Sequence, residues 1–519
     1  MFVVQASLAA ITCLTASPGS RERHLPAVQR AGPVYLWPRF RFGLGARDAS
    51  PMRAREHRRS CGRIGPVQDR IVVWSRRACS LPPVDDRVGL LVRYGGEFVD
   101  GVVGRASGSF VETVDGRRVL DFTAGQICAT VGHNHPRVVA AIERACRDVL
   151  HLNSWMLSEP VLALAQRLVG TLPEPLRRVM LLSTGGEGIE AGLRMAKLSS
   201  GRFEVLSLTR SWHGVTGGAS AVTYAASRHG YGPMVPGAFA LPAPYAYRCP
   251  IRHCDEVCDC SCLEAGFELF DQVSAGSPAA VVAEPVLSAG GVIVPPPGYF
   301  ARLAELAHER GMLVMLDECQ TGLGRLGTMY GFQVYGVVPD LLVLSKTLGG
   351  GVPISALITS SAIERECFGR GFTHVTSHVS DPMPAAAALA VIDVVEEEHL
   401  ADRARARGHY LLERLGDLQE RHEQIGDVRG LGLLCGLELV LSRDTREPAD
   451  ALGLALTDEC QRRGLSINLV RGGTGGQASC LRMAPPLTVS EDEIDLAATI
   501  IDEALRTVVN RTAPAAAAS

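Results

Sequence analysis

Residues 341–351 read LLVLSKTLGGG: four aliphatic residues, a serine, Lys346 and a turn rich in glycine. The aliphatic run is apolar at every position, which is typical of a strand covered on both faces of a parallel sheet. Three more runs share this character: Val179–Leu182, Ala280–Ala283 and Leu313–Leu316. Segments with helical spacing lie between them, such as Tyr299–Gly311, which ends at a glycine. The alternation predicts an α/β fold with a mostly parallel sheet and helices on both sides.

The C-terminal part of the chain has a different pattern. A charged helical stretch covers residues 396–421, and the glycine-punctuated run 431–440 and the run Leu465–Val470 resemble strands. Ser490 and Glu493 form a capping box, in which each side chain bonds to the backbone N–H of the other residue at a helix start. These features predict a smaller α+β domain.

The bulk composition is that of an ordinary globular protein. The chain has 519 residues, 46% of them hydrophobic, so it can bury a large core in more than one domain-sized unit. A net charge of −3 gives no basic excess that would indicate binding to nucleic acid or to a membrane surface. We find no uninterrupted run of about 18 apolar residues and expect no transmembrane helix. The 15 cysteines are scattered through a long chain, which favours reduced thiols in a cytoplasmic protein.

The first 85 residues differ from the rest, because residues 21–79 are rich in Arg and Pro. A disordered leader, or an extension from a misassigned start codon with Met52 as a later start, is our first expectation. A mitochondrial-type presequence stays open, and so does a secretory signal, although no basic segment precedes the apolar stretch Phe2–Leu14. The expected organisation is a leader (1–85), the N-terminal part of a small domain (86–135), a large domain (136–395), the C-terminal part of the small domain (396–510) and a frayed tail (511–519).

Lys346 occupies an unusual place, directly after a strand that is expected to be buried. Burying an ammonium group is costly, and a desolvated lysine has a lowered pKa that makes it a nucleophile able to form an imine. A lysine whose stem crosses apolar surface while its ammonium reaches water explains the same pattern. Lys346 alone therefore decides nothing.

Asp317 follows the run Leu313–Leu316 at the carboxyl end of a strand, which is where α/β sheets place ligands. A carboxylate there could pair with a protonated pyridine nitrogen and keep the ring cationic, so that the ring withdraws electrons. Metal binding and helix capping explain this aspartate equally well when it is taken alone.

Residues 183–188 read STGGEG and precede the helical run Ile189–Leu198. A strand, a small-residue turn and a helix start form an anion site from backbone N–H groups and the helix dipole. The turn is not a Walker motif, because the Gly-Lys-Ser/Thr ending is missing. A plain helix cap is the simple alternative.

Residues 211–214 read SWHG, which places Trp212 before a glycine turn. Such an aromatic side chain could stack on a flat cofactor ring, although a single tryptophan more often belongs to a core. The anion turn, Trp212, Asp317 and Lys346 follow one another, each at or near the end of a strand-like run. One shared site explains this order better than four independent coincidences.

Longer stretches resemble the class III (ω-amino) aminotransferases of fold type I, and within that family the 2,2-dialkylglycine decarboxylases most. The resemblance covers about Leu91 to Leu505. It is carried by LVRYGG at 91–96, LDFTAGQ at 120–126, SWHG at 211–214, TSHVSDP at 376–382 and LRMAPPLTVS at 481–490. The last two stretches are specific to the subfamily. The resemblance implies a large domain with a mostly parallel seven-stranded sheet, a smaller α+β domain and the cofactor pyridoxal 5′-phosphate (PLP).

The resemblance also implies roles for individual residues of the cofactor site. Lys346 would be the Schiff-base lysine and would carry the proton between the substrate Cα and the cofactor, and Asp317 would pair with the pyridine nitrogen. The other implied cofactor residues are Trp212, stacked on the ring; Gln320, at the 3-oxygen; Thr184, Gly185 and Gly186, at the phosphate; Glu284; and Ser377, at the phosphate of the neighbouring subunit.

Substrate and ion sites are implied in the same way. Gln126 would lie beside the bond that breaks, with Ser154 in the substrate site, and Arg482 would bind a substrate carboxylate, for which a guanidinium is suited. Because Ser377 would serve the neighbouring subunit, we expect a homodimer or a homotetramer with shared active sites. An alkali ion, K⁺ or Na⁺, would be held by Leu152, Ser154, Ser377, Val379 and Asp381, some of them through backbone carbonyls.

The implied reaction is decarboxylation-coupled transamination. A 2,2-dialkylglycine such as 2-aminoisobutyrate loses CO₂, and a 2-oxo acid such as pyruvate receives the amino group. Gln126, Ser154 and the stretch 376–382 favour this reaction. An ω-amino acid aminotransferase of the 4-aminobutyrate type, which shares every cofactor residue and releases no CO₂, is the alternative. A binding protein without activity is disfavoured by the presence of Lys346 and Asp317.

Three positions depart from the family pattern. The helix after the anion turn begins with Gly188-Ile189, where a small polar residue and Asn are usual, Ala289 replaces a Ser, and Cys319 replaces an Ala. None of these changes removes a catalytic group. We expect the helix start at Gly188 to be slightly less stable than usual.

Five cysteines and His253 lie close together between Cys249 and Cys262. Zinc needs four ligands in tetrahedral geometry, and the spacing lacks paired C-x-x-C knuckles. We therefore expect a surface loop of reduced thiols and keep a structural metal as the alternative.

Overall fold

A sheet of seven strands forms the centre of the fold, in a computed structural model that describes residues 86–225, 228, 230–249, 251, 258–471 and 479–512. The strands are β4 (Leu176–Leu182), β5 (Glu204–Leu208), β6 (Ala238–Leu241), β7 (Pro278–Ala283), β8 (Leu313–Asp317), β9 (Leu341–Leu344) and β10 (Ser355–Ser360). Their order is β4-β10-β9-β8-β7-β5-β6. β10 is antiparallel to β4 and β9, and the other neighbouring pairs are parallel. The predicted α/β fold with a mostly parallel seven-stranded sheet is confirmed.

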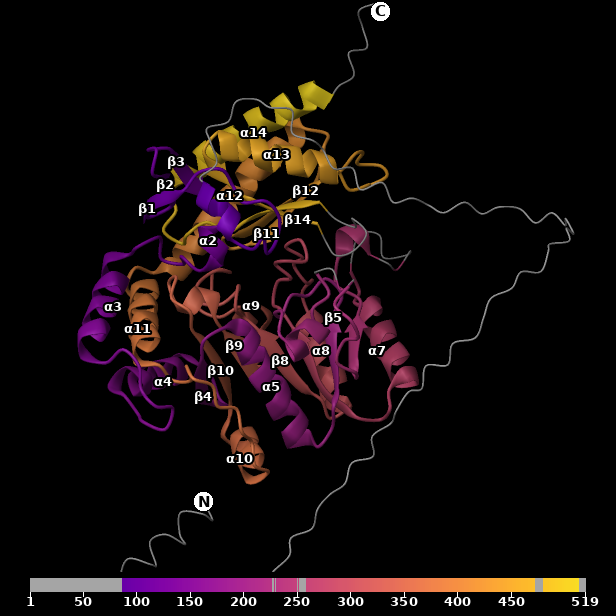
Figure 1. The fold of residues 1–519 in the computed structure, drawn as a ribbon. Coiled ribbons are helices and arrows are strands. Elements are labelled where there is room, and N and C mark those ends of the chain that lie inside the picture. Colours follow the sequence, from indigo (N-terminus) through magenta and orange to yellow (C-terminus); the bar gives the residue numbers. More distant parts are fainter. Residues whose placement is uncertain are drawn as a thin grey trace, which may run out of the picture. The chain divides into compact units, whose positions relative to one another are not determined.

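Both faces of this sheet are covered, and β9 shows why its sequence is apolar throughout. Leu342 and Leu344 belong to one buried cluster, whereas Leu341 and Val343 belong to another, because alternate side chains of a strand point to opposite faces. α5 (Gly185–Ser200) supplies the helix side of the second cluster. The first cluster contains residues of α4 (Glu159–Thr171), α7 (Ser261–Val273) and α8 (Tyr299–Glu309). α7 packs against β6 and α8 against β8, and Figure 1 shows the two helices side by side.

Two further sheets have four strands each. The first joins β1 (Val103–Ser107), β2 (Phe110–Thr113) and β3 (Arg118–Asp121) to β13 (Leu465–Ser466), which runs parallel to β3. The second is antiparallel and contains β11 (Ile425–Leu431), β12 (Leu434–Leu439), β15 (Cys480–Met483) and β14 (Asn468–Val470). α12 (Leu400–Arg421) and α13 (Asp450–Arg462) pack against these sheets, and α14 (Glu491–Thr512) packs against both helices. The three helices are grouped at the top of Figure 1. Segments from both ends of the described chain therefore share one sheet.

Two C-terminal runs are divided differently from their predicted form. Run 431–440 contains the turn of the hairpin between β11 and β12. The turn needs glycine at position 432, because φ is +54° there and a Cβ would lie 2.4 Å from the Arg325 carbonyl oxygen. The run Leu465–Val470 supplies β13 to one sheet and β14 to the other. Tertiary pairing, which a local pattern does not contain, decides both outcomes. The predicted domain limits stay predictions.

The predicted capping box is present at the start of α14. Ser490 N donates to Glu493 Oε2 at 2.9 Å, and Glu493 N donates to Ser490 Oγ at 3.2 Å. The remaining helices are η1 (Asp86–Leu90), α2 (Ala124–Ile127), α3 (Pro136–Asp148), α6 (Gly217–Ala221), η2 (Ala246–Arg248), α9 (Phe332–Tyr335), η3 (Lys346–Leu348), α10 (Ser361–Gly369) and α11 (Pro382–Glu397).

Some sequence-based expectations fall on residues that the structure does not describe. They concern the leader 1–85, the tail from residue 513 and the cysteine loop, since His253 and Cys254 lie outside the described residues. These expectations stay predictions. Within the described ranges, no helix has the length and apolar character needed to cross a membrane.

Candidate active site

The residues predicted to form one site come together at a single edge of the seven-stranded sheet. Because β10 is antiparallel to both β4 and β9, β4 runs in the same direction as the other five strands. Thr184 follows β4, Asp317 ends β8 and Lys346 follows β9. β10 begins at the same edge, where Ser355 Oγ donates to the Thr184 carbonyl oxygen at 2.8 Å. The carboxyl edge of an α/β sheet is the usual place for a ligand.

Asp317 is a buried carboxylate with two partners. His213 Nδ1 lies 2.8 Å from its Oδ2, and Cys319 N donates to its Oδ1 at 3.0 Å. His213 Nε2 lies 3.1 Å from Ser207 Oγ, so the imidazole is fixed on both sides. Burial raises the pKa of Asp317, but the hydrogen bond and the charge of His213 outweigh burial and hold the pKa below its usual value. The carboxylate is therefore ionised at neutral pH, as a partner of a cationic ring nitrogen must be.

Lys346 begins the short helix η3, with one residue between it and the end of β9. Burial raises the pKa values of two thiols, Cys319 and Cys128, and the charge of Lys346 opposes this rise at both. Cys319 lies two residues after Asp317, and Cys128 lies two residues after Gln126. The lysine is therefore close to the two segments that carry these predicted site residues.

The predicted anion turn caps the start of α5. Thr184 is the N-cap: its Oγ1 accepts from Glu187 N at 3.3 Å, and Glu187 Oε2 accepts from Thr184 N at 3.2 Å. Gly185 and Gly186 are the first two helical residues, so their N–H groups lie at the positive end of the helix dipole. A Cβ on Gly185 would lie 2.7 Å from Cys319 Sγ. The turn therefore packs closely against the segment that follows β8.

Trp212 lies in the loop after β5, beside the anion turn. Its neighbour Gly214 has φ +128°, and a Cβ there would lie 3.0 Å from Gly186 Cα, so the two loops touch. Trp212 N donates to Glu284 Oε1 at 2.8 Å. Glu284 is buried, and burial, reinforced by Asp317, raises its pKa to about 7. The predicted cofactor residues at the ends of β4, β5, β7, β8 and β9 thus form one cluster.

Arg482 on β15 reaches this cluster from the second small sheet. The residue is 8% exposed, and its Nη1 donates to Gln320 Oε1 and to Ser288 Oγ, both at 3.2 Å. Burial lowers the pKa of Arg482, and the charge of Glu284 opposes this effect. In the described part of the chain Arg482 has no salt bridge to a carboxylate. A buried cation without a paired anion is costly, which fits a guanidinium that binds an anionic ligand.

Gln126 lies on the turn between β3 and α3 and is exposed. Three of the residues 124–127 have positive φ. Thr130 Oγ1 donates to the Thr347 carbonyl oxygen at 3.0 Å. This hydrogen bond ties the segment after Gln126 to the residue that follows Lys346.

The predicted alkali-ion ligands lie in two loops that approach each other. Ser154 Oγ donates to the Thr376 carbonyl oxygen at 3.2 Å, which joins the loop after α3 to the loop before α11. The two oxygens of Asp381 each lie 2.6 Å from an imidazole Nδ1, those of His151 and His378. The other predicted ligands in these loops are Leu152, Ser377 and Val379. Ser377 is exposed in the single chain, and its contact with a second subunit stays a prediction.

The unusual Gly188 has a packing reason. A Cβ on this residue would lie 2.7 Å from Val343 Cγ1. Glycine therefore lets the first turn of α5 lie close to β9, the strand that leads to Lys346. The other two departures, Ala289 and Cys319, follow Ser288 and Glu318 at the margin of the cluster.

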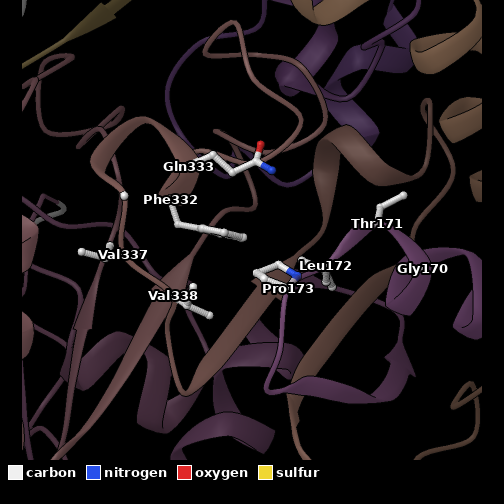
Figure 2. A pocket seen from close by; sticks show the side chains of 9 residues that line it. Gly170, Thr171, Leu172, Pro173, Phe332, Gln333, Val337 and Val338 are labelled. Atoms are coloured by element: carbon white, nitrogen blue, oxygen red, sulfur yellow. The ribbon is translucent and has the colours of Figure 1, made fainter.

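A pocket of about 520 Å³ lies away from this cluster, beside the end of α4 and the helix α9. Figure 2 shows Thr171, Pro173 and Phe332 among the side chains that line it. None of the predicted site residues belongs to its lining.

Comparison with known proteins agrees with the geometry. The sequence pattern of the class-III aminotransferases matches residues 95–505. An uncharacterised aminotransferase of Schizosaccharomyces pombe is 44% identical over 417 residues, which are 80% of this chain and 92% of the relative. A probable 4-aminobutyrate aminotransferase of Bacillus subtilis is 32% identical over 78% of this chain and 92% of its own length. An amine transaminase from an uncultivated Pseudomonas species, solved in its PLP-bound form, has a TM-score of 0.74 and 31% identity, covering 80% of this chain and 98% of its own. The chain belongs to the class-III aminotransferase family.

Proposed function

We propose that this chain is a PLP enzyme that couples decarboxylation to transamination. A 2,2-dialkylglycine and a 2-oxo acid give a ketone, CO₂ and an L-amino acid, so that 2-aminoisobutyrate and pyruvate give acetone, CO₂ and L-alanine. The observation that carries the assignment to PLP chemistry, which the alternative reaction shares, is the arrangement of Lys346, the ionised Asp317 and the N-terminus of α5 at one sheet edge. Gln126, Ser154 and the stretch 376–382 support the decarboxylating reaction.

The residues present fit PLP. The donors suited to its phosphate are the N–H groups of Gly185 and Gly186 and the Thr184 hydroxyl, whose oxygen already accepts from Glu187 N. Gln320 Oε1 accepts from Arg482, which leaves the Gln320 amide N–H groups for the 3-oxygen of the ring. Asp317 suits the ring nitrogen and Trp212 the ring face, while Glu284 lies between these two residues. When bound, the cofactor supplies an electron-withdrawing ring that accepts the electron pair of the broken bond.

The reaction follows from what these side chains do. Asp317 would keep the ring nitrogen protonated, and Gln126 would orient the amino acid so that its carboxylate is the group poised to leave. A quaternary Cα carries no proton, so CO₂ is the group that leaves. Lys346 then delivers a proton to C4′ of the cofactor, as a general acid. In the second half of the cycle Arg482 binds the carboxylate of the 2-oxo acid.

We further propose a homodimer or homotetramer in which Ser377 reaches the phosphate of the neighbouring subunit. We also propose K⁺ or Na⁺ beside Asp381, held by oxygens of Leu152, Ser154, Ser377 and Val379, because carbonyl, hydroxyl and carboxylate oxygens suit these cations. Exchange of K⁺ for Li⁺ is expected to change the activity of the wild-type protein and not that of Asp381→Asn. The predicted cytoplasmic location rests on composition and stays a proposal.

The deciding experiment measures CO₂ from 2-aminoisobutyrate in the presence of pyruvate. Equal amounts of CO₂, acetone and L-alanine are expected. The alternative, an ω-amino acid aminotransferase of the 4-aminobutyrate type, is favoured by the similarity to the Bacillus subtilis relative. Absence of CO₂ together with normal transamination of a primary amine would refute decarboxylation and support that alternative.

A further inference from the structure

One buried carboxylate holds the turn that carries Gln126. Asp121, the last residue of β3, is 4% exposed. Its Oδ1 accepts from the N–H and the hydroxyl of Thr123 at 3.0 and 2.5 Å. Its Oδ2 accepts from Gly125 N at 2.6 Å and lies 2.8 Å from His133 Nε2. Both carboxylate oxygens are therefore used to fasten the turn to the end of β3.

The turn has a strained backbone. Ala124 and Ile127 have φ values of +45° and +64°, and Gly125 between them has φ +66° and ψ −108°. Such conformations are unfavourable for residues with a Cβ and persist only where the surroundings fix them. Ala124 and Ile127 are buried, whereas Gln126 is exposed. The distortion therefore turns Gln126 away from the core.

Hydrogen bonds connect the same segment to two other parts of the candidate site. The Thr130 hydroxyl donates to the carbonyl of Thr347, next to Lys346, at 3.0 Å. Ala484 N, two residues after Arg482, donates to the Phe122 carbonyl oxygen at 2.7 Å. If the turn relaxed, Gln126 would therefore move relative to Lys346 and to Arg482 on β15, which would stay in place.

The carboxylate is ionised in this arrangement. Burial raises the pKa of Asp121, but the hydrogen bonds from His133, Thr123 and Gly125 hold the pKa below its usual value. Asparagine has nearly the same shape but only one accepting oxygen. An Asp121→Asn variant therefore keeps the volume of the side chain and loses the acceptor on one side of the turn.

We propose that Asp121, itself held by His133, is a positioning residue that fixes Gln126 and thereby selects which bond to the substrate Cα breaks. This inference rests on the proposed decarboxylation. L-Alanine offers both choices: loss of CO₂ leaves the bonding electron pair on the substrate and leads to acetaldehyde, whereas transfer of the α-proton to Lys346 leads to pyruvate. A fixed Gln126 favours the first outcome, and a loose turn favours the second.

The test compares product ratios in the holoenzyme. Asp121→Asn is expected to lower the rate of CO₂ release from 2-aminoisobutyrate by about 10- to 100-fold, because small misplacements of an orienting group have effects of this size. The pyruvate-to-acetaldehyde ratio from L-alanine should rise, while cofactor absorbance and the KM for the 2-oxo acid stay unchanged. His133→Gln, which keeps a donor, should retain the wild-type ratio, and His133→Ala should raise it. Asp115→Asn is the matched control, since Asp115 accepts from the Thr113 hydroxyl in an exposed hairpin turn.

A double-mutant cycle separates positioning from general stability. In a Gln126→Ala background, adding Asp121→Asn should have little further effect, because both changes act through the same side chain. An equal loss in both backgrounds would overturn the proposal. If the wild-type protein releases no CO₂ from either donor, the decarboxylation proposal fails separately. The cycle is then measured on the transamination of L-alanine, where equal effects of Asp121→Asn in the wild-type and Gln126→Ala backgrounds again refute the role of Asp121.

Discussion

Replacing Asp317 with asparagine is expected to leave the fold intact and to slow the reaction by about 10²- to 10⁴-fold. Asparagine keeps the side-chain volume and the acceptor for Cys319 N, but it removes the negative charge that faces His213. Asparagine would also leave the cationic ring nitrogen of the bound cofactor without its anionic partner, a loss of about 3–5 kcal/mol for a buried charge pair. Each 1.36 kcal/mol is a factor of ten in rate, so this loss corresponds to about two to four decades.

The assay is a single turnover of the holoenzyme with 2-aminoisobutyrate, followed by the absorbance of the bound cofactor. Asp340→Asn is the matched control, because His308 Nε2 lies 2.9 Å from Asp340 Oδ2 in a second His–Asp pair, placed at the opposite end of β9. The control should stay within about threefold of the wild type. If Asp317→Asn also stays within about threefold while the cofactor remains bound, the pairing of Asp317 with the ring nitrogen is refuted.

Three further changes test packing, pH dependence and substrate binding. Gly188→Ala should lower the free energy of unfolding in urea by about 1–3 kcal/mol, because the added Cβ would lie 2.7 Å from Val343 Cγ1. Gly170→Ala is the control and should raise this free energy, because no atom lies within 4 Å of its added Cβ. Equal effects of the two changes would contradict the packing argument. Burial raises the pKa of Glu318 from 4.5 to about 7, so the folded state retains a proton that the unfolded state has lost, and stability falls as pH rises through this window. Glu318→Gln should remove that part of the slope of Tm against pH, and an unchanged slope would show that Glu318 does not titrate there. Arg482→Lys should raise the KM for pyruvate by about tenfold, because an ammonium cannot form a bidentate pair with a carboxylate, with cofactor absorbance unchanged; an unaltered KM would remove Arg482 from the carboxylate site.

The sequence was most informative where chemistry follows a buried strand. The run at 341–344 predicts both ends of β9 correctly, and it therefore places Lys346 at the carboxyl edge of the sheet. β8 gives Asp317 its place in the same way. These local patterns suffice because each strand and the functional residue at its end are neighbours in the chain.

The partners of the site residues could not be predicted in the same way. His213 stands in the quoted stretch SWHG, but its role depends on Asp317, 104 positions away. The role of Asp121 likewise depends on the turn at 123–127 and on His133. The hydrophobic periodicity of the sequence does not predict these contacts. The two strands within Leu465–Val470 belong to different sheets because their pairing partners are β3 and β15. Long-range pairing of this kind is set by tertiary packing and leaves no pattern within one segment.

One compositional signal is stronger than the local patterns. The chain has 52 basic Lys and Arg residues, and only Lys197 and Lys346 among them are lysines. A protein that uses arginine almost everywhere else keeps lysine at Lys346. Only an amine that can lose its proton forms an imine, and a guanidinium cannot do so.

This scarcity of lysine also gives the most direct test of the account. Borohydride reduction of the holoenzyme converts a C=N bond between a lysine and PLP into a stable amine, and peptide mass mapping then locates the label. Lys197, in the last turn of α5, is an internal control. A phosphopyridoxyl group is expected on Lys346 alone, and it should be absent in Lys346→Ala. A label on Lys197, or no label after reconstitution with PLP, would contradict this expectation.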